Sequence, residues 1–254
     1  MASPLIEPAL LPVDWSGLGG VDLHARYFSE CRGGDFYDVL PVGERVLFFL
    51  TDIAGPRPKA QELAQKAQIA FRAKSQEFFQ GTEVNESDAI AELAHAVNLS
   101  LIDESEKVRF APTFLGCFNR PLGILTYCNG GNLLALYREG AQAHVLESGG
   151  MPLGLFTHTT FEAAVLVLQE GDALLLTTKG VPESTRGKEQ FGVERVIRLL
   201  TASNSLSASQ ICETVLRRAH DFATRSWWQG LLPGVKASGD HEDLTALALL
   251  HHRR

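Results

Sequence analysis

Two acidic turns lie close together near the start of the chain. Residues 33–38 read GGDFYD and residues 51–55 read TDIAG, with the apolar run 46–50 between them. Such a run is typical of a buried strand. An Asp at the end of a strand presents a carboxylate where hard divalent cations and their waters are commonly held. The two turns therefore predict a divalent-metal site.

A third segment repeats the strand-then-turn design with a different charge. Residues 172–178 read DALLLTT, and Lys179 and Gly180 follow at the turn. A protonated lysine cannot replace a carboxylate as a cation ligand. The structural interpretation of Lys179 is an exposed or ion-paired side chain, and that of Asp172 is an ordinary turn residue.

Composition sets limits on the class of protein. The chain has 254 residues, is 45% hydrophobic, and has a net charge of −7 from 30 acidic and 23 basic residues. This predicts one globular domain over 1–254 and disfavours nucleic-acid or anionic-membrane partners. Nothing approaches the about 18 apolar residues needed to span a bilayer, and the N-terminus lacks signal-peptide features, so we expect a cytoplasmic protein. We expect Cys117 and Cys128 to be buried thiols.

Hydrophobic periodicity gives the order of elements. An alternating strand is predicted over 21–28, a helix over 59–80, and a second helix with Ser87 as its N-cap. Short β-rich runs separated by glycine turns fill 114–176. Helices over 193–200 and 208–224 and a strand over 244–250 complete the pattern. It predicts an α+β fold with helices packed outside stacked antiparallel sheets.

Nine short motifs occur in the order found in a known family. They are LLP at 10–12, GGDFYD at 33–38, TDIAG at 51–55, NGG at 129–131, PLG at 152–154, GD at 171–172, TKGVPE at 178–183, FG at 191–192 and EDLT at 242–245. Together they resemble the PPM-type serine/threonine phosphatases, most closely the bacterial SpoIIE and RsbU branch. The resemblance implies an α-β-β-α sandwich with a site for two Mn²⁺ or Mg²⁺ ions at one edge, where a metal-activated water attacks phosphate.

The resemblance also implies roles for individual residues. Asp52 would bridge the two metals, the Ile53 carbonyl would contact one of them, and Asp35 would lie in the inner or outer shell of that ion. Asp38 and Asp243 are weaker candidates, each open to a structural interpretation. Two positions that would normally supply carboxylates for the other ion hold Lys179 and Glu242.

These departures bear directly on metal binding. Glu242 can still ligate a hard cation, or it can be a solvated surface acid. Lys179 would repel a divalent ion and could replace it through a salt bridge. Arg57, in a Pro-Arg-Pro segment where the family usually keeps a glycine, would contact phosphate or only fill space.

Two functions remain open from the sequence. The favoured one is a pseudophosphatase, or weakly active form, that acts by binding a regulatory protein. The alternative is an active phosphatase that removes phosphate from serine or threonine of an anti-sigma-antagonist-like phosphoprotein. A homodimer is compatible with either function.

Overall fold

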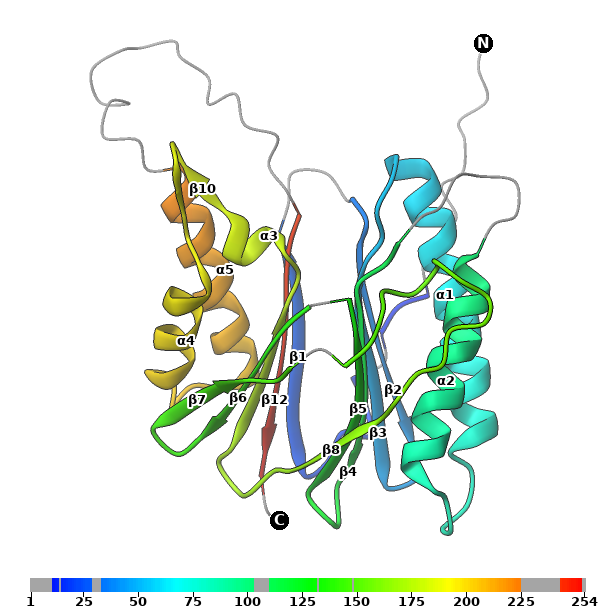
Figure 1. Cartoon of the computed structure of the whole chain (residues 1–254). Coiled ribbons are helices and arrows are strands. Elements are labelled where there is room, and N and C mark those ends of the chain that lie inside the picture. Colours follow the sequence, from blue (N-terminus) through cyan, green and yellow to red (C-terminus); the bar gives the residue numbers. More distant parts are fainter. Residues whose placement is uncertain are drawn as a thin grey trace, which may run out of the picture.

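The computed structural model describes residues 11–13, 15–28, 33–102, 110–131, 133–147, 149–224 and 243–252. Two five-stranded antiparallel sheets stack face to face (Figure 1). The first sheet has the order β1-β12-β9-β6-β7, formed by β1 (Val21–Phe28), β12 (Leu244–His251), β9 (Ala173–Thr177), β6 (Leu134–Glu139) and β7 (Gln142–Val145). The second has the order β2-β3-β4-β5-β8, formed by β2 (Asp35–Val42), β3 (Arg45–Asp52), β4 (Thr113–Asn119), β5 (Ile124–Gly130) and β8 (Ala164–Val167).

A pair of helices covers the outer face of each sheet (Figure 1). Helices α1 (Arg57–Phe78) and α2 (Glu86–Leu101) pack on the second sheet. Helices α4 (Val193–Thr201) and α5 (Ala208–Thr224) pack on the first. The one-turn helix α3 (Gly180–Glu183) and the hairpin of β10 (Thr185–Arg186) and β11 (Glu189–Gln190) lead from β9 to α4. The predicted α-β-β-α sandwich is confirmed.

Three apolar layers hold this arrangement together. The middle layer lies between the two sheets and includes Phe48, Phe114 and Leu247, all fully buried. The two outer layers lie between each sheet and its helix pair. Strands buried on both faces carry continuous apolar runs, which explains why 46–50 and 244–250 are readable as strands. The predicted burial of Cys117 and Cys128 is also confirmed.

The two helix starts on the second sheet differ from expectation. Helix α1 begins at Arg57, with Pro58 in its first turn, two residues before the predicted start. Proline is tolerated there because the missing N–H would have no helical acceptor. The N-cap of α2 is Asn85, whose Oδ1 accepts a hydrogen bond from the Asp88 N–H at 3.4 Å. The prediction of Ser87 as the cap was wrong.

Among the helices that the structure describes, none combines the length and the apolar character that a membrane crossing requires.

Candidate functional site

The predicted acidic residues meet at one edge of the sandwich, at the end where β2 begins and β3 ends. Asp35 and Asp52 are direct partners in the antiparallel pairing of β2 with β3. Oδ2 of Asp35 accepts hydrogen bonds from the hydroxyls of Thr178, at 2.6 Å, and Thr245, at 2.7 Å. Because these threonines follow β9 and lie in β12, Asp35 connects the two sheets at this edge.

The carboxylates of this edge are costly to keep ionised. Burial is the main cause that raises the pKa of Asp35 well above its usual range, and the neighbouring Asp52 carboxylate adds to it. The bonds from Thr178 and Thr245 oppose this shift. Burial also raises the pKa of Asp52, against the opposing effect of Lys179. Clustered acids with raised pKa values are a common property of functional sites.

A glycine allows the backbone to approach closely beside Asp52. The Ile53 N–H donates to the Gly34 carbonyl at 2.9 Å. A Cβ atom on Gly34 would lie 2.0 Å from the Ile53 carbonyl oxygen, so no other residue fits without moving the chain. The conformation of residues 33–35 therefore depends on glycine, and the Ile53 carbonyl lies against the backbone of Gly34, the residue before Asp35.

Lys179 lies at the same edge. It is the residue before α3, and its Nζ is 3.9 Å from Oδ2 of Asp52. The lysine side chain is 51% exposed and that of Asp52 is 13% exposed. Gly180 fixes the backbone next to it, because a Cβ there would lie 2.0 Å from the Asp243 carbonyl oxygen. The ammonium group is thus the nearest cation to Asp52 among the described side chains.

Asp243 also belongs to this cluster. Its Oδ1 accepts a hydrogen bond from the Tyr27 hydroxyl at 2.6 Å, and that hydroxyl accepts one from the Gly33 N–H at 2.8 Å. A Cβ on Gly33 would lie 1.6 Å from Oδ2 of Asp243. Sequence reasoning missed Tyr27 because the alternation of its strand gave no sign of a polar role.

The remaining candidates lie elsewhere. Asp38 is fully buried against α1, where its two oxygens pair with Arg72 at 2.7 and 2.9 Å. The structure therefore does not bring it to Asp35 and Asp52. Arg57 is exposed at the first position of α1. Glu242 lies outside the described residues.

A two-cation centre does not fit the described donor set. Within the described ranges, no group of three or more His, Cys, Asp or Glu side chains is arranged to hold a metal ion. One oxygen of Asp35 is used by two hydroxyls, and one oxygen of Asp243 by Tyr27. Magnesium and manganese need several oxygen ligands, and the Lys179 ammonium would repel an ion that shared Asp52. The described side chains therefore do not by themselves form a two-metal centre.

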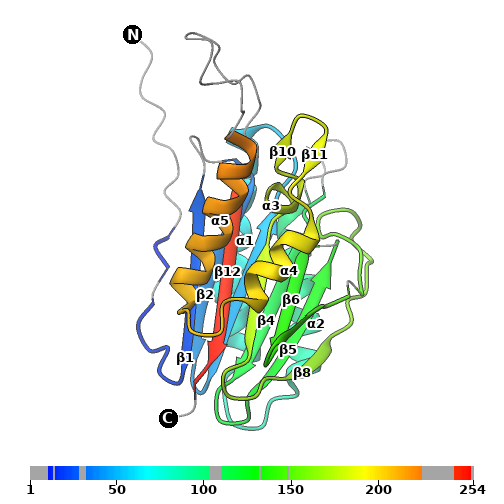
Figure 2. The same ribbon diagram turned by 90° about the vertical axis from the view of Figure 1, so that its left-hand side faces the viewer.

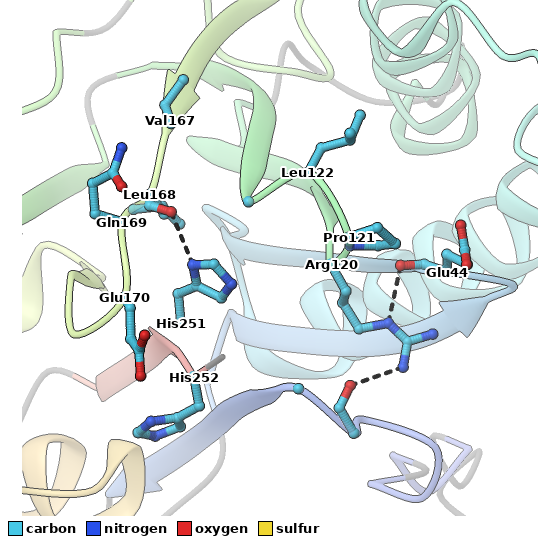
Figure 3. A pocket seen from close by; sticks show the side chains of 13 residues that line it. Glu44, Arg120, Pro121, Leu122, Val167, Leu168, Gln169, Glu170, His251 and His252 are labelled. Atoms are coloured by element: carbon cyan, nitrogen blue, oxygen red, sulfur yellow. Dashed lines mark hydrogen bonds between the residues drawn. The ribbon is translucent and has the colours of Figure 1, made fainter. Parts of the chain in front are cut away.

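The opposite end of the sandwich carries a hollow that is lined by different residues (Figure 3). A cavity of about 580 Å³ lies beside Arg120, in the turn between β4 and β5. The guanidinium donates to the backbone carbonyls of Glu44 at 2.9 Å, Gly17 at 2.9 Å, Gly19 at 3.1 Å, and Gly43. Its donors are used to join three turns, so the role of Arg120 at this end is structural.

The comparisons with known proteins agree with the fold. The family model "Stage II sporulation protein E (SpoIIE)" matches residues 43–248, a span that includes Asp52 and Lys179. Protein IcfG of Synechocystis is 27% identical over 268 residues, covering 96% of this chain and 40% of that protein.

Solved structures give the same result. The RsbU and RsbW domains of Rv1364c from Mycobacterium tuberculosis match with a TM-score of 0.71 at 23% identity, covering 92% of this chain and 62% of that one. The SiaA-PP2C domain of Pseudomonas aeruginosa matches with a TM-score of 0.72 at 12% identity, covering 91% of this chain and 86% of that one.

These matches define the class as a PPM-type phosphatase fold, which confirms the resemblance given by the nine motifs. The chain belongs to the SpoIIE family. It spans about two fifths of the length of its curated relative IcfG.

Proposed function

We propose that this SpoIIE-family protein acts as a signalling module that binds a regulatory protein and has little or no phosphatase activity of its own. The observation that carries this proposal is the 3.9 Å distance from Lys179 Nζ to Asp52 Oδ2. By the family resemblance, a carboxylate for the second cation belongs at position 179. A positive charge there opposes cation binding and partly neutralises Asp52 instead.

The contacts at this edge support a structural and binding role rather than a hydrolytic one. Asp35 joins the two sheets through Thr178 and Thr245, which gives it a structural role without a metal. Gly34 and Gly180 keep the backbone in close contact at the same place. A fold held in this way can present a partner-binding surface after its hydrolytic chemistry is lost.

A second candidate is an active Mn²⁺- or Mg²⁺-dependent phosphatase acting on a phosphoserine or phosphothreonine of a regulatory protein. Asp35 and Asp52 are opposite each other in the pairing of β2 with β3, and the Ile53 carbonyl lies against Gly34, the residue before Asp35. The half-exposed Lys179 side chain has room to move toward solvent. Glu242 would then supply a further ligand.

A phosphatase assay separates the two candidates. We expect the wild-type protein to hydrolyse p-nitrophenyl phosphate with Mn²⁺ no faster than its Asp52→Asn variant. The double variant Lys179→Asp/Glu242→Asp restores the family's carboxylates and should gain activity that Asp52→Asn removes. Wild-type hydrolysis that is abolished by Asp52→Asn would instead support the active enzyme.

A similar solved protein suggests the class of partner that this chain binds. The solved relative from Mycobacterium tuberculosis combines RsbU and RsbW domains in one protein. We propose that this chain likewise works with a regulatory protein of a bacterial signalling system. Co-purification of this chain with a candidate regulatory protein would test whether they associate. The comparison is between the wild-type chain and variants of its surface.

A further inference from the structure

A second hollow lies on the outer surface of α4 and α5, the helix pair that packs on the first sheet. The hairpin β10–β11 stands beside α4 and α5 (Figure 2), and together these elements line a cleft of about 380 Å³. Four of the lining side chains are arginines and one, Asp221, is acidic, while the apolar part includes Phe222; the arginines are Arg186, Arg195, Arg198 and Arg218. Such a concentration of positive charge is notable in a chain of net charge −7.

Two of the arginines are held in place. Arg186 and Arg195 both pair with Glu189, the former at 2.9 Å. Their guanidinium groups also lie 4.5 and 4.8 Å from the centre of the Phe222 ring. Contacts with a carboxylate and an aromatic face fix the planes of these groups before any ligand arrives. They form a preorganised wall of the cleft.

The other two arginines form no ion pair with a described carboxylate. Arg198 on α4 and Arg218 on α5 are both exposed. Over the ranges that the structure describes, neither lies within ion-pair distance of a carboxylate, in contrast to Arg217, which pairs with Glu213 at 3.2 Å. Asp221 is the one acid among the described lining side chains, against four arginines. The exposed guanidinium groups of Arg198 and Arg218 therefore remain suited to bidentate binding of carboxylates.

The shape of the cleft restricts the ligand. Phe191 is buried, and Phe222 is partly buried with its ring already in contact with Arg186, Arg195 and Phe191. An apolar side chain of a ligand can pack against the part of Phe222 that is still exposed and against Leu199, which also lines the cleft. The net charge of −7 opposes association with nucleic acid, whose phosphates would meet repulsion from the rest of the surface. A short protein segment can contact the positive cleft without covering the acidic remainder.

We propose that this cleft is a docking site for an acidic segment of a partner protein. Carboxylates of the segment pair with Arg198 and Arg218, and an apolar side chain of the segment packs on Phe222. The pairing is electrostatically steered and therefore sensitive to salt. The proposal is independent of whether the Asp52 edge binds metal.

Fluorescence anisotropy with a labelled glutamate-rich peptide carrying a central leucine tests this docking site. We expect binding to the wild-type protein that weakens as salt is raised. Arg198→Glu/Arg218→Glu should weaken it by at least about tenfold, since two attractive pairs become repulsive. Replacing the leucine of the peptide by serine should weaken binding as well.

The matched control is Arg26→Glu/Arg217→Glu, which makes the same change in net charge at two exposed arginines that both contact Glu213. We expect it to retain binding within about twofold, because neither of these arginines lines the cleft. If the Glu variant of the cleft does not fold, Arg198→Gln/Arg218→Gln replaces it.

Three results would overturn the docking site. One is equal weakening by the cleft and control variants, which would reduce the effect to net charge. Another is the absence of peptide binding to the folded wild-type protein at low salt. The third is binding to phosphatidylglycerol vesicles without binding to the peptide, which would assign the cleft to a membrane surface.

Discussion

The two ends of the sandwich differ in how their charged side chains are paired. At the acidic edge, Asp35 and Asp52 face each other, and the nearest described cation, Lys179, is 3.9 Å from Asp52. At the other end, Arg120 donates to four backbone carbonyls, and Arg45 pairs with Glu86 at 2.6 Å. The charged groups at the opposite end have defined partners and stabilise the fold. The acidic edge instead combines neighbouring carboxylates whose pKa values are raised, a pattern that is common at functional sites.

The largest effect is expected at the buried pair of the opposite end. Replacing Arg45 by Met leaves the mostly buried Glu86 carboxylate with Asn119, at 2.7 Å, as its remaining strong donor. We expect the free energy of unfolding, measured with urea, to fall by about 3 kcal/mol. The double variant Arg45→Met/Glu86→Gln should recover part of the loss. A fall below about 1 kcal/mol, the size of an exposed pair, would contradict this assignment.

Arg120 should come next. Arg120→Ala removes the side chain that joins three turns, and we expect unfolding to become easier by about 2 kcal/mol, the range for hydrogen bonds to a charged group. Arg120→Lys is the matched control, because an ammonium keeps the charge but lacks the planar fork of donors. Full rescue by lysine would show that charge alone, and not the set of carbonyl contacts, stabilises this end.

At the acidic edge, in contrast, we expect removal of a charge to stabilise the protein. Since the pKa of Asp35 is raised in the folded protein, ionised Asp35 costs stability once the pH exceeds its unfolded value of about 3.9. Asp35→Asn stays neutral and can still accept from Thr178 and Thr245. In metal-free buffer we expect the variant to be more stable than wild type at pH 7, with a gain that shrinks as the pH falls toward 4.

Thermal or urea unfolding at several pH values checks this expectation. Asp38→Asn is a useful contrast, because Asp38 is paired with Arg72 and its replacement should destabilise the protein at pH 7. An Asp35→Asn variant that is less stable than wild type at pH 7 would show that the ionised carboxylate is well compensated by its surroundings.

The smallest effect on stability is expected at Lys179. Its side chain is half-exposed and its contact with Asp52 is long, so Lys179→Ala should change the free energy of unfolding by no more than about 0.5 kcal/mol. Lys179→Arg, which retains the charge, serves as the control. A loss well above this in urea unfolding would mean that the lysine holds the edge together structurally.

Much of the fold was predictable because its signals are local. Strand 21–28 and helix 208–224 coincide with β1 and α5, since alternation and helical periodicity report burial directly. The start of α2 was missed because Asn85 and Ser87 are both good N-caps two residues apart. Which of them caps the helix depends on the path of the preceding loop.

The site was predictable only in part. Asp35 and Asp52 flank one hairpin, so their proximity follows from strand pairing. The alternation of side chains along a strand places Asp38, three residues after Asp35, on the opposite face, and that rule could have removed it from the candidates. The contacts of Asp35 with Thr178 and Thr245 cross between sheets and depend on how the sheets pack.

Calorimetric titration with Mn²⁺ of the wild-type protein, Lys179→Asp and Asp52→Asn tests most directly whether Lys179 replaces a cation. If Lys179 occupies the place of a cation, the wild type binds at most one ion weakly. Lys179→Asp should then gain at least about tenfold in affinity or a second ion, and Asp52→Asn should bind none. Tight binding of two ions by the wild-type protein, lost in Asp52→Asn, would show that Lys179 does not replace a cation and would establish a complete metal centre.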